Sequence, residues 1–318
     1  MRLVNIPRIG VSVGEGRDRV FCDERFAEPP STRESTGSRV MTNSTKRFTS
    51  ILICALVLSG TISAKTDGTR VFEISFFSGV LQREMPVSIV APSARSIDAP
   101  VLVLLHGRGR NHRSLVDVES SREQLLAADI WVFLPQGEDG WYINSPVRSV
   151  DRYEDYLDEV LTVVKNEFKL TQPPIQWAIT GWSMGGYGAM RYAIRHPEEF
   201  NSVSAMIGLL DFPREANLPV GQNYEVPGAR FGQDRTVWSD YNPIHAVAAL
   251  RGKPVMLITA DAAFDRTMNE NFSAALVAQK IGHQIITLEG GHTFEVVQNA
   301  LPLVLDFVRE TTSPATRR

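Results

Sequence analysis

A serine flanked by glycines is the part of this chain best suited to chemistry. Ser183 lies within residues 181–185 (GWSMG), after an apolar segment at 175–180 and before a helix-forming segment that Pro197 ends. A strand, a tight turn and a helix in this order hold a serine hydroxyl at the edge of a sheet, where the first N–H groups of the helix face developing negative charge. The pattern predicts that Ser183 is a nucleophile rather than an ordinary loop serine.

A serine hydroxyl is nearly inert at neutral pH, so a nucleophilic serine needs a base within hydrogen-bonding reach. His292 fits by position, because it follows two glycines after the last predicted strand and precedes the last predicted helix. This matches a chain order of serine, acid and histidine. The other histidines fall in predicted loops or at element ends, where solvated, capping or loop-shaping roles are common; they are His106, His112, His196, His245 and His283.

The acid that orients the base is expected just after the predicted strand at 255–259. Asp261 and Asp265 both qualify by position. We favour Asp265, because Asp261 follows the strand so closely that its side chain can cap the turn instead. From these residues alone both candidates stay open.

Ester cleavage also builds an oxyanion, whose charge backbone N–H groups can stabilise. We expect one donor at Met184, the residue after the serine, and a second at Arg108, in the glycine-containing loop after an apolar strand. Trp182 and Trp141 are candidate substrate-binding residues near these motifs. Aromatic loop residues can equally pack on the core, and that alternative stays open for both.

From about residue 69 the chain alternates strand and helix patterns, which predicts an α/β fold with a mostly parallel sheet covered by helices on both faces. Apolar runs predict strands, and three- and four-residue spacing predicts helices. The expected strands are 71–77 and 85–90, paired antiparallel, then 101–105, 130–134, 175–180, 202–209, 255–259 and 284–288. The expected helices are 114–128, one with Asp151 as its N-cap that reaches Phe168, then 184–196, 268–281 and 294–309.

One segment interrupts this alternation. Residues 211–243 contain four prolines among glycines, charges and aromatics, and are too long for an ordinary connection in a compact domain. Two interpretations are open. The excursion walls the acyl or alcohol pocket, or it is a surface loop with no substrate role.

Composition narrows the class of protein. The 318 residues and 43% hydrophobic content suit one large globular domain. The net charge is -3 and positive and negative residues are interspersed, so the sequence does not predict a basic surface that would bind nucleic acid. The two cysteines, Cys22 and Cys54, both precede the predicted catalytic domain. This domain therefore has no thiol nucleophile, disulfide or cysteine zinc site, and we expect no metal or organic cofactor.

Residues 41–64 have the three-part layout of a secretory signal peptide: a basic opening from Met41, an apolar run at 48–58 that is too short to span a bilayer, and small residues up to Ala64. Because such peptides begin at the N-terminus, we expect Met41 to be the start and residues 1–40 to be a start-site overcall or a disordered extension. The alternative is a short membrane-associated or buried helix. The predicted organisation is then a signal peptide at 41–64, an α/β-hydrolase catalytic domain at 66–311 and a frayed tail at 312–318.

Six motifs follow one another along the chain: HG at 106–107, GWY at 140–142, YEDYL at 153–157, GWSMGGYGA at 181–189, RHP at 195–197 and GH at 291–292. Together they resemble the putative-esterase branch of the α/β-hydrolase superfamily, which includes S-formylglutathione hydrolases, tributyrin and feruloyl esterases and mycolyltransferases. The resemblance implies a serine esterase in which Ser183 and His292 match the nucleophile and base. The chain departs from the family in the segment before the catalytic acid, where Ala260 or Ala262 replaces a glycine. Its predicted export signal also fits poorly with S-formylglutathione hydrolases, because those enzymes act on a cytosolic thiol adduct.

We therefore predict an exported serine carboxylesterase, secreted or periplasmic, that acts through an acyl-serine intermediate. Its partner is a small-molecule or polysaccharide-linked ester, with no nucleic acid and no stable membrane insertion after signal cleavage. One alternative uses the same triad of Ser183, His292 and Asp265 as an acyltransferase or peptidase. Another is a catalytically silent secreted binding module on a hydrolase scaffold.

Overall fold

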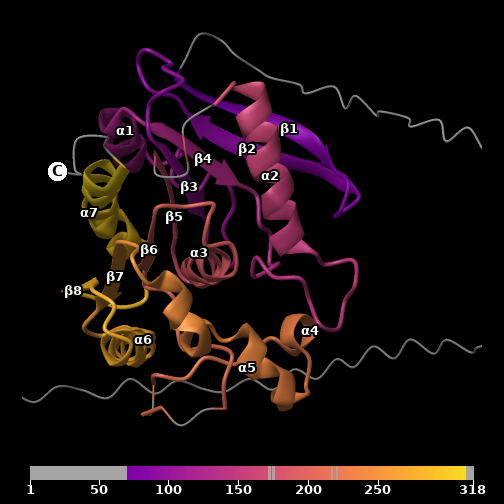
Figure 1. Cartoon of the computed structure of the whole chain (residues 1–318), viewed down its shortest axis with the longest axis vertical. Coiled ribbons are helices and arrows are strands. Elements are labelled where there is room, and N and C mark those ends of the chain that lie inside the picture. The colour runs from indigo at the N-terminus through magenta and orange to yellow at the C-terminus, as the bar shows by residue number, and fades with distance from the viewer. Residues whose placement is uncertain (1–69, 171–172, 174–175, 216–217, 220, 313–318) are drawn as a thin grey trace, which may run out of the picture. The chain divides into compact units, whose positions relative to one another are not determined.

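Eight strands form a single sheet in the order β1-β2-β4-β3-β5-β6-β7-β8 (Figure 1). The computed structural model describes residues 70–312 apart from 171–172, 174–175, 216–217 and 220, so the predicted signal peptide, the segment before it and residues 313–318 lie outside the described residues. The strands are β1 (Val71–Ser78), β2 (Arg83–Val90), β3 (Val101–Leu105), β4 (Trp131–Pro135), β5 (Trp177–Gly181), β6 (Ser202–Met206), β7 (Val255–Ala260) and β8 (Gln284–Leu288).

The sheet is antiparallel at one end and parallel elsewhere. β1 pairs with β2 and β2 pairs with β4 in antiparallel register, whereas every pairing from β4 to β8 is parallel. Parallel strands require crossover helices, which cover both faces of such a sheet. The predicted α/β fold with a mostly parallel sheet is confirmed.

Every residue of the central strands β3, β5, β6 and β7 is buried, because helices lie on both sides of them. Alternate side chains of β3 show the two faces. Val103 belongs to the apolar cluster under α2, α3 and α6, while Leu104 belongs to the cluster under α1 and α7. An unbroken apolar run is therefore the signature of a strand with two covered faces.

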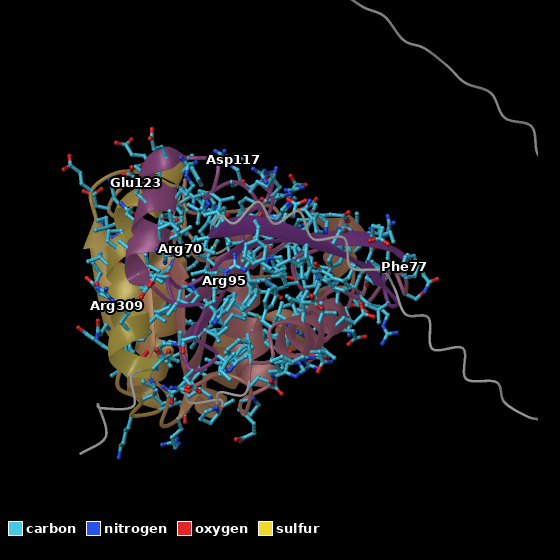
Figure 2. The ribbon with its side chains drawn as sticks, turned by 90° about the horizontal axis from the view of Figure 1, so that it is seen from above. Arg70, Phe77, Arg95, Asp117, Glu123 and Arg309 are labelled. Carbon is cyan, nitrogen blue, oxygen red and sulfur yellow. The ribbon has the colours of Figure 1, made fainter. Side chains whose placement is uncertain are left out.

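The helices divide between these faces (Figure 1). No helix among the described residues is both long enough and apolar enough to cross a membrane. One face carries α2 (Tyr153–Glu167), α3 (Met184–Arg195) and α6 (Arg266–Ala278), and the other carries α1 (Glu119–Ala128) and α7 (Phe294–Thr312). Figure 2 shows Glu123 and Arg309 pointing outward from the α1 and α7 side.

Two helix starts differ from the predictions. The first helix begins at Glu119 rather than at residue 114, because Asn111 holds a local turn in which its amide oxygen accepts from the backbone N–H of Arg113. Asp151 is not a cap of α2, whose N-cap is Arg152 without a side-chain hydrogen bond. The buried Asp151 carboxylate instead binds Arg230, which lies 79 residues away in sequence.

Strand β6 ends at Met206, three residues earlier than predicted. Ile207 has a left-handed backbone with φ of +43°, which turns the chain out of the sheet beside the serine. The last two predicted helices also differ in their bounds: α6 starts two residues earlier, and α7 continues to Thr312.

The excursion at 211–243 folds into short helices that pack on the domain. They are α4 (Gly228–Phe231), η2 (Arg235–Val237) and α5 (Trp238–Tyr241), followed by η3 (Pro243–Leu250). Phe212 and Phe231 are fully buried in the core under α3. The excursion therefore supplies core packing, which neither of the two interpretations of its sequence included.

The two edges of the sheet are β1 and β8. β8 is the more exposed strand, with two of its five residues only partly buried and the rest exposed. At the other edge, Figure 2 shows Phe77 at the far tip of β1, where half of its surface is exposed. β8 is therefore the least protected strand of the parallel part of the sheet.

A buried charge cluster joins α2 to α3. The Glu154 carboxylate on α2 accepts hydrogen bonds from Arg191, Arg195 and His196, and the side chains of Glu154 and Arg191 are 5% and 7% exposed. Burial alone raises the pKa of Glu154, but the His196 hydrogen bond and the arginine charges outweigh burial and lower this pKa to about 2. The carboxylate therefore stays ionised and anchors the helix that follows Ser183.

Removing this carboxylate is expected to destabilise the fold. Glu154→Gln leaves the Arg191 guanidinium buried without its counter-charge, so we expect the free energy of unfolding to fall by about 3 kcal/mol. The measurement is urea denaturation near neutral pH. The matched control is Glu199→Gln, which breaks the half-exposed pair with Lys165 and should cost less than about 1 kcal/mol. Equal losses in the two variants would contradict the anchoring role of Glu154.

Candidate active site

The turn between β5 and α3 forces Ser183 into an unusual backbone conformation, with φ of +54° and ψ of −118°. Such a conformation is costly for a residue with a side chain and persists only where the surroundings fix it. Here the fixing contact is backbone against backbone, since a Cβ on Gly185 would lie 2.2 Å from the carbonyl oxygen of Leu105. A Cβ on Gly181 would likewise meet Gly185 at 2.4 Å. The glycines of the motif are therefore required by contact distance.

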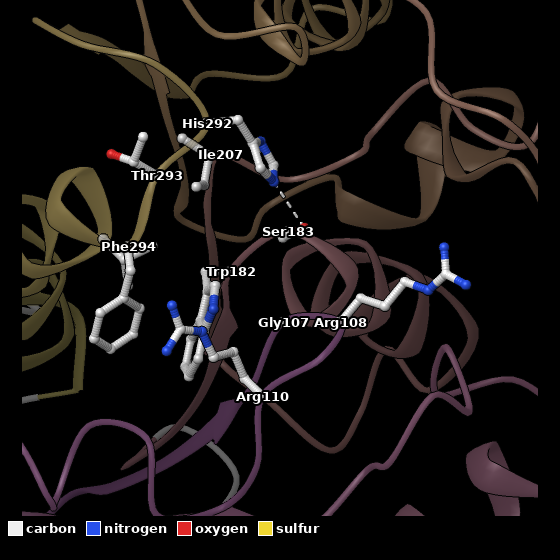
Figure 3. A pocket seen from close by; sticks show the side chains of 10 residues that line it. Gly107, Arg108, Arg110, Trp182, Ser183, Ile207, His292, Thr293 and Phe294 are labelled. Atoms are coloured by element: carbon white, nitrogen blue, oxygen red, sulfur yellow. Dashed lines mark hydrogen bonds between the residues drawn. The ribbon is translucent and has the colours of Figure 1, made fainter. Parts of the chain in front are cut away.

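Three side chains that are far apart in the sequence form one hydrogen-bonded chain. The Oγ atom of Ser183 lies 2.8 Å from Nε2 of His292, and Nδ1 of His292 lies 2.7 Å from Oδ1 of Asp265 (Figure 3 shows the first contact). With the imidazole proton on Nδ1, the histidine donates to the carboxylate and Nε2 accepts from the serine hydroxyl. This arrangement can remove a proton from Ser183 as its oxygen attacks a carbonyl carbon.

The structure separates the two candidate acids. Asp265 is fully buried, and its Oδ2 accepts from Thr259 Oγ1 at 2.8 Å and from Asn269 Nδ2 at 3.0 Å. Asp261 is exposed and accepts from the backbone N–H of Gly290, closing the turn before His292. Only Asp265 contacts the imidazole. Thr259 and Asn269 were not singled out from the sequence, although Asn269 lies four residues after Asp265, one helical turn away.

The two expected oxyanion donors lie beside the serine. The N–H of Ser183 donates to the carbonyl of Met206, whereas the N–H groups of Met184 and Arg108 have no acceptor among the residues that the structure describes. Met184 is the first residue of α3, so its amide also lies at the positive end of the helix dipole. Arg108 follows Gly107, where a Cβ would lie 2.6 Å from Nε1 of Trp182. The missing Cβ lets this loop approach the serine.

His106 fixes the loop that carries Arg108. Its ring is buried, Nδ1 donates to the carbonyl of Gly107 at 2.9 Å, and Nε2 accepts from the N–H of Gly137 at 2.8 Å. A proton on Nε2 would face that N–H group, so the geometry needs the neutral imidazole. Burial is the main cause that lowers the pKa of His106 to about 4. His106 is a structural histidine of the loop, as its position in the sequence indicated.

A cavity of about 130 Å³ opens beside the serine (Figure 3). Its walls combine polar and apolar side chains, and Ser183 and His292 are among them. Trp182, a predicted substrate-binding residue, lines the cavity. Its remaining lining residues are Gly107, Arg108, Arg110, Ile207, Thr293, Phe294 and Val297.

Trp141, the other predicted substrate-binding residue, does not line this cavity, and that prediction is corrected here. Its side chain is fully buried and stacks on Phe212 with 4.9 Å between ring centroids. Phe231 packs edge-on against it with 5.3 Å between ring centroids. Both phenylalanines come from the excursion, so distant residues turn a loop tryptophan into a core residue.

The excursion reaches the site through an aromatic stack. The Phe264 ring lies 4.2 Å from the ring of His292, and Tyr224 stacks on Phe264 at 5.4 Å. The hydroxyl of Tyr224 accepts from the Arg108 side chain at 3.0 Å, and that side chain also pairs with Asp139. The stack therefore packs against the ring of His292. No grouping of His, Cys, Asp and Glu within the described part of the chain is arranged to hold a metal ion.

Comparison with known proteins places this geometry in context. The model of the family described as Putative esterase matches residues 78–305. An acetyl esterase of Caldicellulosiruptor saccharolyticus is 24% identical over 184 residues, which cover 55% of this chain and 68% of that protein. Among solved structures, a ferulic acid esterase superposes with a TM-score of 0.62 at 23% identity over 75% of this chain and 97% of its own. An S-formylglutathione hydrolase from Agrobacterium tumefaciens superposes with a TM-score of 0.65 at 20% identity over 79% of this chain and 99% of its own.

Protonation of His106 is expected to destabilise the fold in acid. The unfolded chain takes up this proton as the pH falls through about 6.5, while the folded protein does so only near a pKa of about 4. The stability that neutral His106 contributes is therefore complete above about pH 6.5 and is lost as the pH falls. Between about pH 7 and about pH 4.5 this group should account for about 2 kcal/mol of lost stability.

The variant that checks this is His106→Gln, because glutamine keeps an acceptor and does not titrate. Urea denaturation at both pH values should show that the variant loses about 2 kcal/mol less than the parent over this interval. Identical losses in the variant and the parent would show that His106 is not the group responsible.

Proposed function

Because this chain belongs to the Putative esterase family and is a serine hydrolase of carboxylic esters, we propose that it acts through an acyl-serine intermediate and that it is exported. The observation that carries the mechanism is the unbroken hydrogen-bonded chain from the Ser183 hydroxyl through His292 to Asp265. The comparisons support ester hydrolysis. Of the three hydrogen-bonded side chains, the serine is the one placed to attack the ester carbonyl, and its attack forms the acyl-serine intermediate.

Each residue then has one chemical role. Ser183 attacks the ester carbonyl while His292 takes the hydroxyl proton, and His292 returns that proton to the departing alcohol. Asp265 holds the imidazole in the tautomer that leaves Nε2 free to accept, helped by its hydrogen bonds to Thr259 and Asn269. Water attacks the acyl-serine in the second half of the reaction, with His292 again as the base.

The oxyanion of each tetrahedral intermediate forms where two amides lack acceptors. The N–H groups of Met184 and Arg108 donate to this oxygen, and each such donor typically contributes a few kcal/mol to the transition state. Trp182 forms a wall of the cavity that receives the substrate. The small volume favours esters with a short chain on the side that enters the cavity, in keeping with the acetyl esterase that is similar to this chain.

The triad assignment predicts unequal effects of three substitutions. Ser183→Ala should lower kcat for a short-chain 4-nitrophenyl ester by about 10⁶-fold, because the nucleophile is lost. Asp265→Asn should lower kcat by about 10⁴-fold, because an asparagine favours the wrong imidazole tautomer. Asp261→Asn is the matched control and should stay within about tenfold of the parent, since Asp261 closes an exposed turn.

Two further measurements make this test decisive. A fluorophosphonate probe should label the parent and fail to label Ser183→Ala, because only an activated serine reacts with it. Circular dichroism of all three variants checks folding. Full activity in Ser183→Ala, or a larger loss in Asp261→Asn than in Asp265→Asn, would overturn the assignment.

Export rests on the sequence of residues 41–64, with its basic start, apolar run and small residues before Ala64. We expect the mature protein from its native cell to begin close after Ala64, and to be found outside the cytoplasm. Placing a charge in the apolar run, as in Leu52→Arg, should block export and leave residues 41–64 attached. Edman sequencing or mass spectrometry reads the N-terminus, and a mature N-terminus within residues 1–40 would contradict export.

A further inference from the structure

Three arginines lie in the loop that follows β3, and two of them are paired. The Arg108 side chain contacts Asp139 at 3.0 Å, and Arg113 contacts Asp117 at 2.6 Å and Glu73 at 3.4 Å. Arg110 has no carboxylate partner among the residues that the structure describes. One guanidinium of this loop is therefore left with its charge uncompensated by the protein.

This unpaired guanidinium lies at the cavity beside the nucleophile. Figure 3 shows the Arg110 side chain folding back past Trp182 toward Phe294. Its Cζ atom lies 4.4 Å from the centre of the Phe294 ring, which is close enough for a cation–π contact. The ring holds one face of the guanidinium, so the N–H groups around its edge remain available to an acceptor.

The rest of the cavity limits what that acceptor can be attached to. The apolar part of its lining comes from Trp182, Ile207, Phe294 and Val297. The volume of about 130 Å³ is somewhat smaller than the roughly 150 Å³ cavity that holds a benzene molecule in an engineered lysozyme core. A chain of a few carbon atoms fits within this volume.

We propose that Arg110 binds a carboxylate carried by the substrate, so that the preferred substrates are short esters with a negative charge a few bonds from the ester group. Guanidinium and carboxylate match in charge and in their paired donor and acceptor geometry. The inference rests on the proposed esterase mechanism and adds a substrate class to it. The carboxylate can sit on the acyl part or on the alcohol part of the ester, and the two give different experiments.

Matched ester pairs test the preference, with hydrolysis followed by titration of the released acid. For the acyl part, monomethyl succinate is compared with methyl pentanoate, and for the alcohol part 3-acetoxypropanoate is compared with butyl acetate. Within each pair a carboxylate replaces an apolar end of similar size. We expect kcat/KM to favour the charged ester by about tenfold in one of the two pairs, which identifies the part that enters the cavity.

The same ratio of kcat/KM values is then measured in variants. Arg110→Gln should remove the preference, and Arg110→Lys should keep part of it, because lysine retains the charge without the paired donors. Arg113→Gln is the control from the same loop, outside the cavity, and should keep the parental ratio. An unchanged ratio in Arg110→Gln, or no preference for either charged ester in the parent, overturns this inference while neutral-ester hydrolysis upholds the esterase. Failure to hydrolyse any of the four esters, together with no fluorophosphonate labelling, overturns both.

Discussion

The active site depends on one close contact, in which one stretch of backbone packs against another at the turn that carries Ser183. The start of α3 lies so near to the end of β3 that no Cβ fits at residue 185, where it would reach 2.2 Å from a carbonyl oxygen. This contact holds Ser183 in its strained conformation and brings the loop after β3, with its oxyanion donor, beside the serine hydroxyl. Strain of this kind persists only when the surroundings determine it, and here both neighbours are buried strands. The active-site geometry is thus a consequence of how closely two central strands and one helix pack.

Two buried carboxylates show how the fold uses charge for different purposes. Glu154 is surrounded by cations on the next helix, which lower its pKa and dock α2 on α3. Among the residues that the structure describes, no arginine or lysine forms an ion pair with Asp265, and its oxygens are instead satisfied by Thr259, Asn269 and His292. Neutral donors leave its charge to be balanced by the imidazole alone. That arrangement favours the imidazolium that forms when the serine loses its proton, whereas an arginine at this place would compete with it.

The sequence was sufficient where local pattern decides structure. The apolar runs of β3, β5 and β7 predicted strands, and the glycines around Ser183 and before His292 predicted the turns that the structure contains. It was insufficient where a partner comes from far away. Asp151 forms an ion pair with Arg230 instead of capping the helix that follows it, and Trp141 packs against two phenylalanines of the excursion. Neither partner can be identified from residue spacing, because the connecting segment has no periodicity.

The three hydrogen-bonded catalytic residues follow strands that differ greatly in how deeply they are buried. Ser183 follows the central strand β5, Asp265 follows β7, and His292 follows β8, which lies at the edge and is mostly exposed. Edge strands with few buried contacts open at a lower free energy than the core of a domain. Detachment of β8 would carry the imidazole away while the nucleophile turn and the buried acid stayed in place. We therefore expect heat inactivation of the enzyme to begin with local opening at this margin of the sheet, before the cooperative melting of the remaining strands.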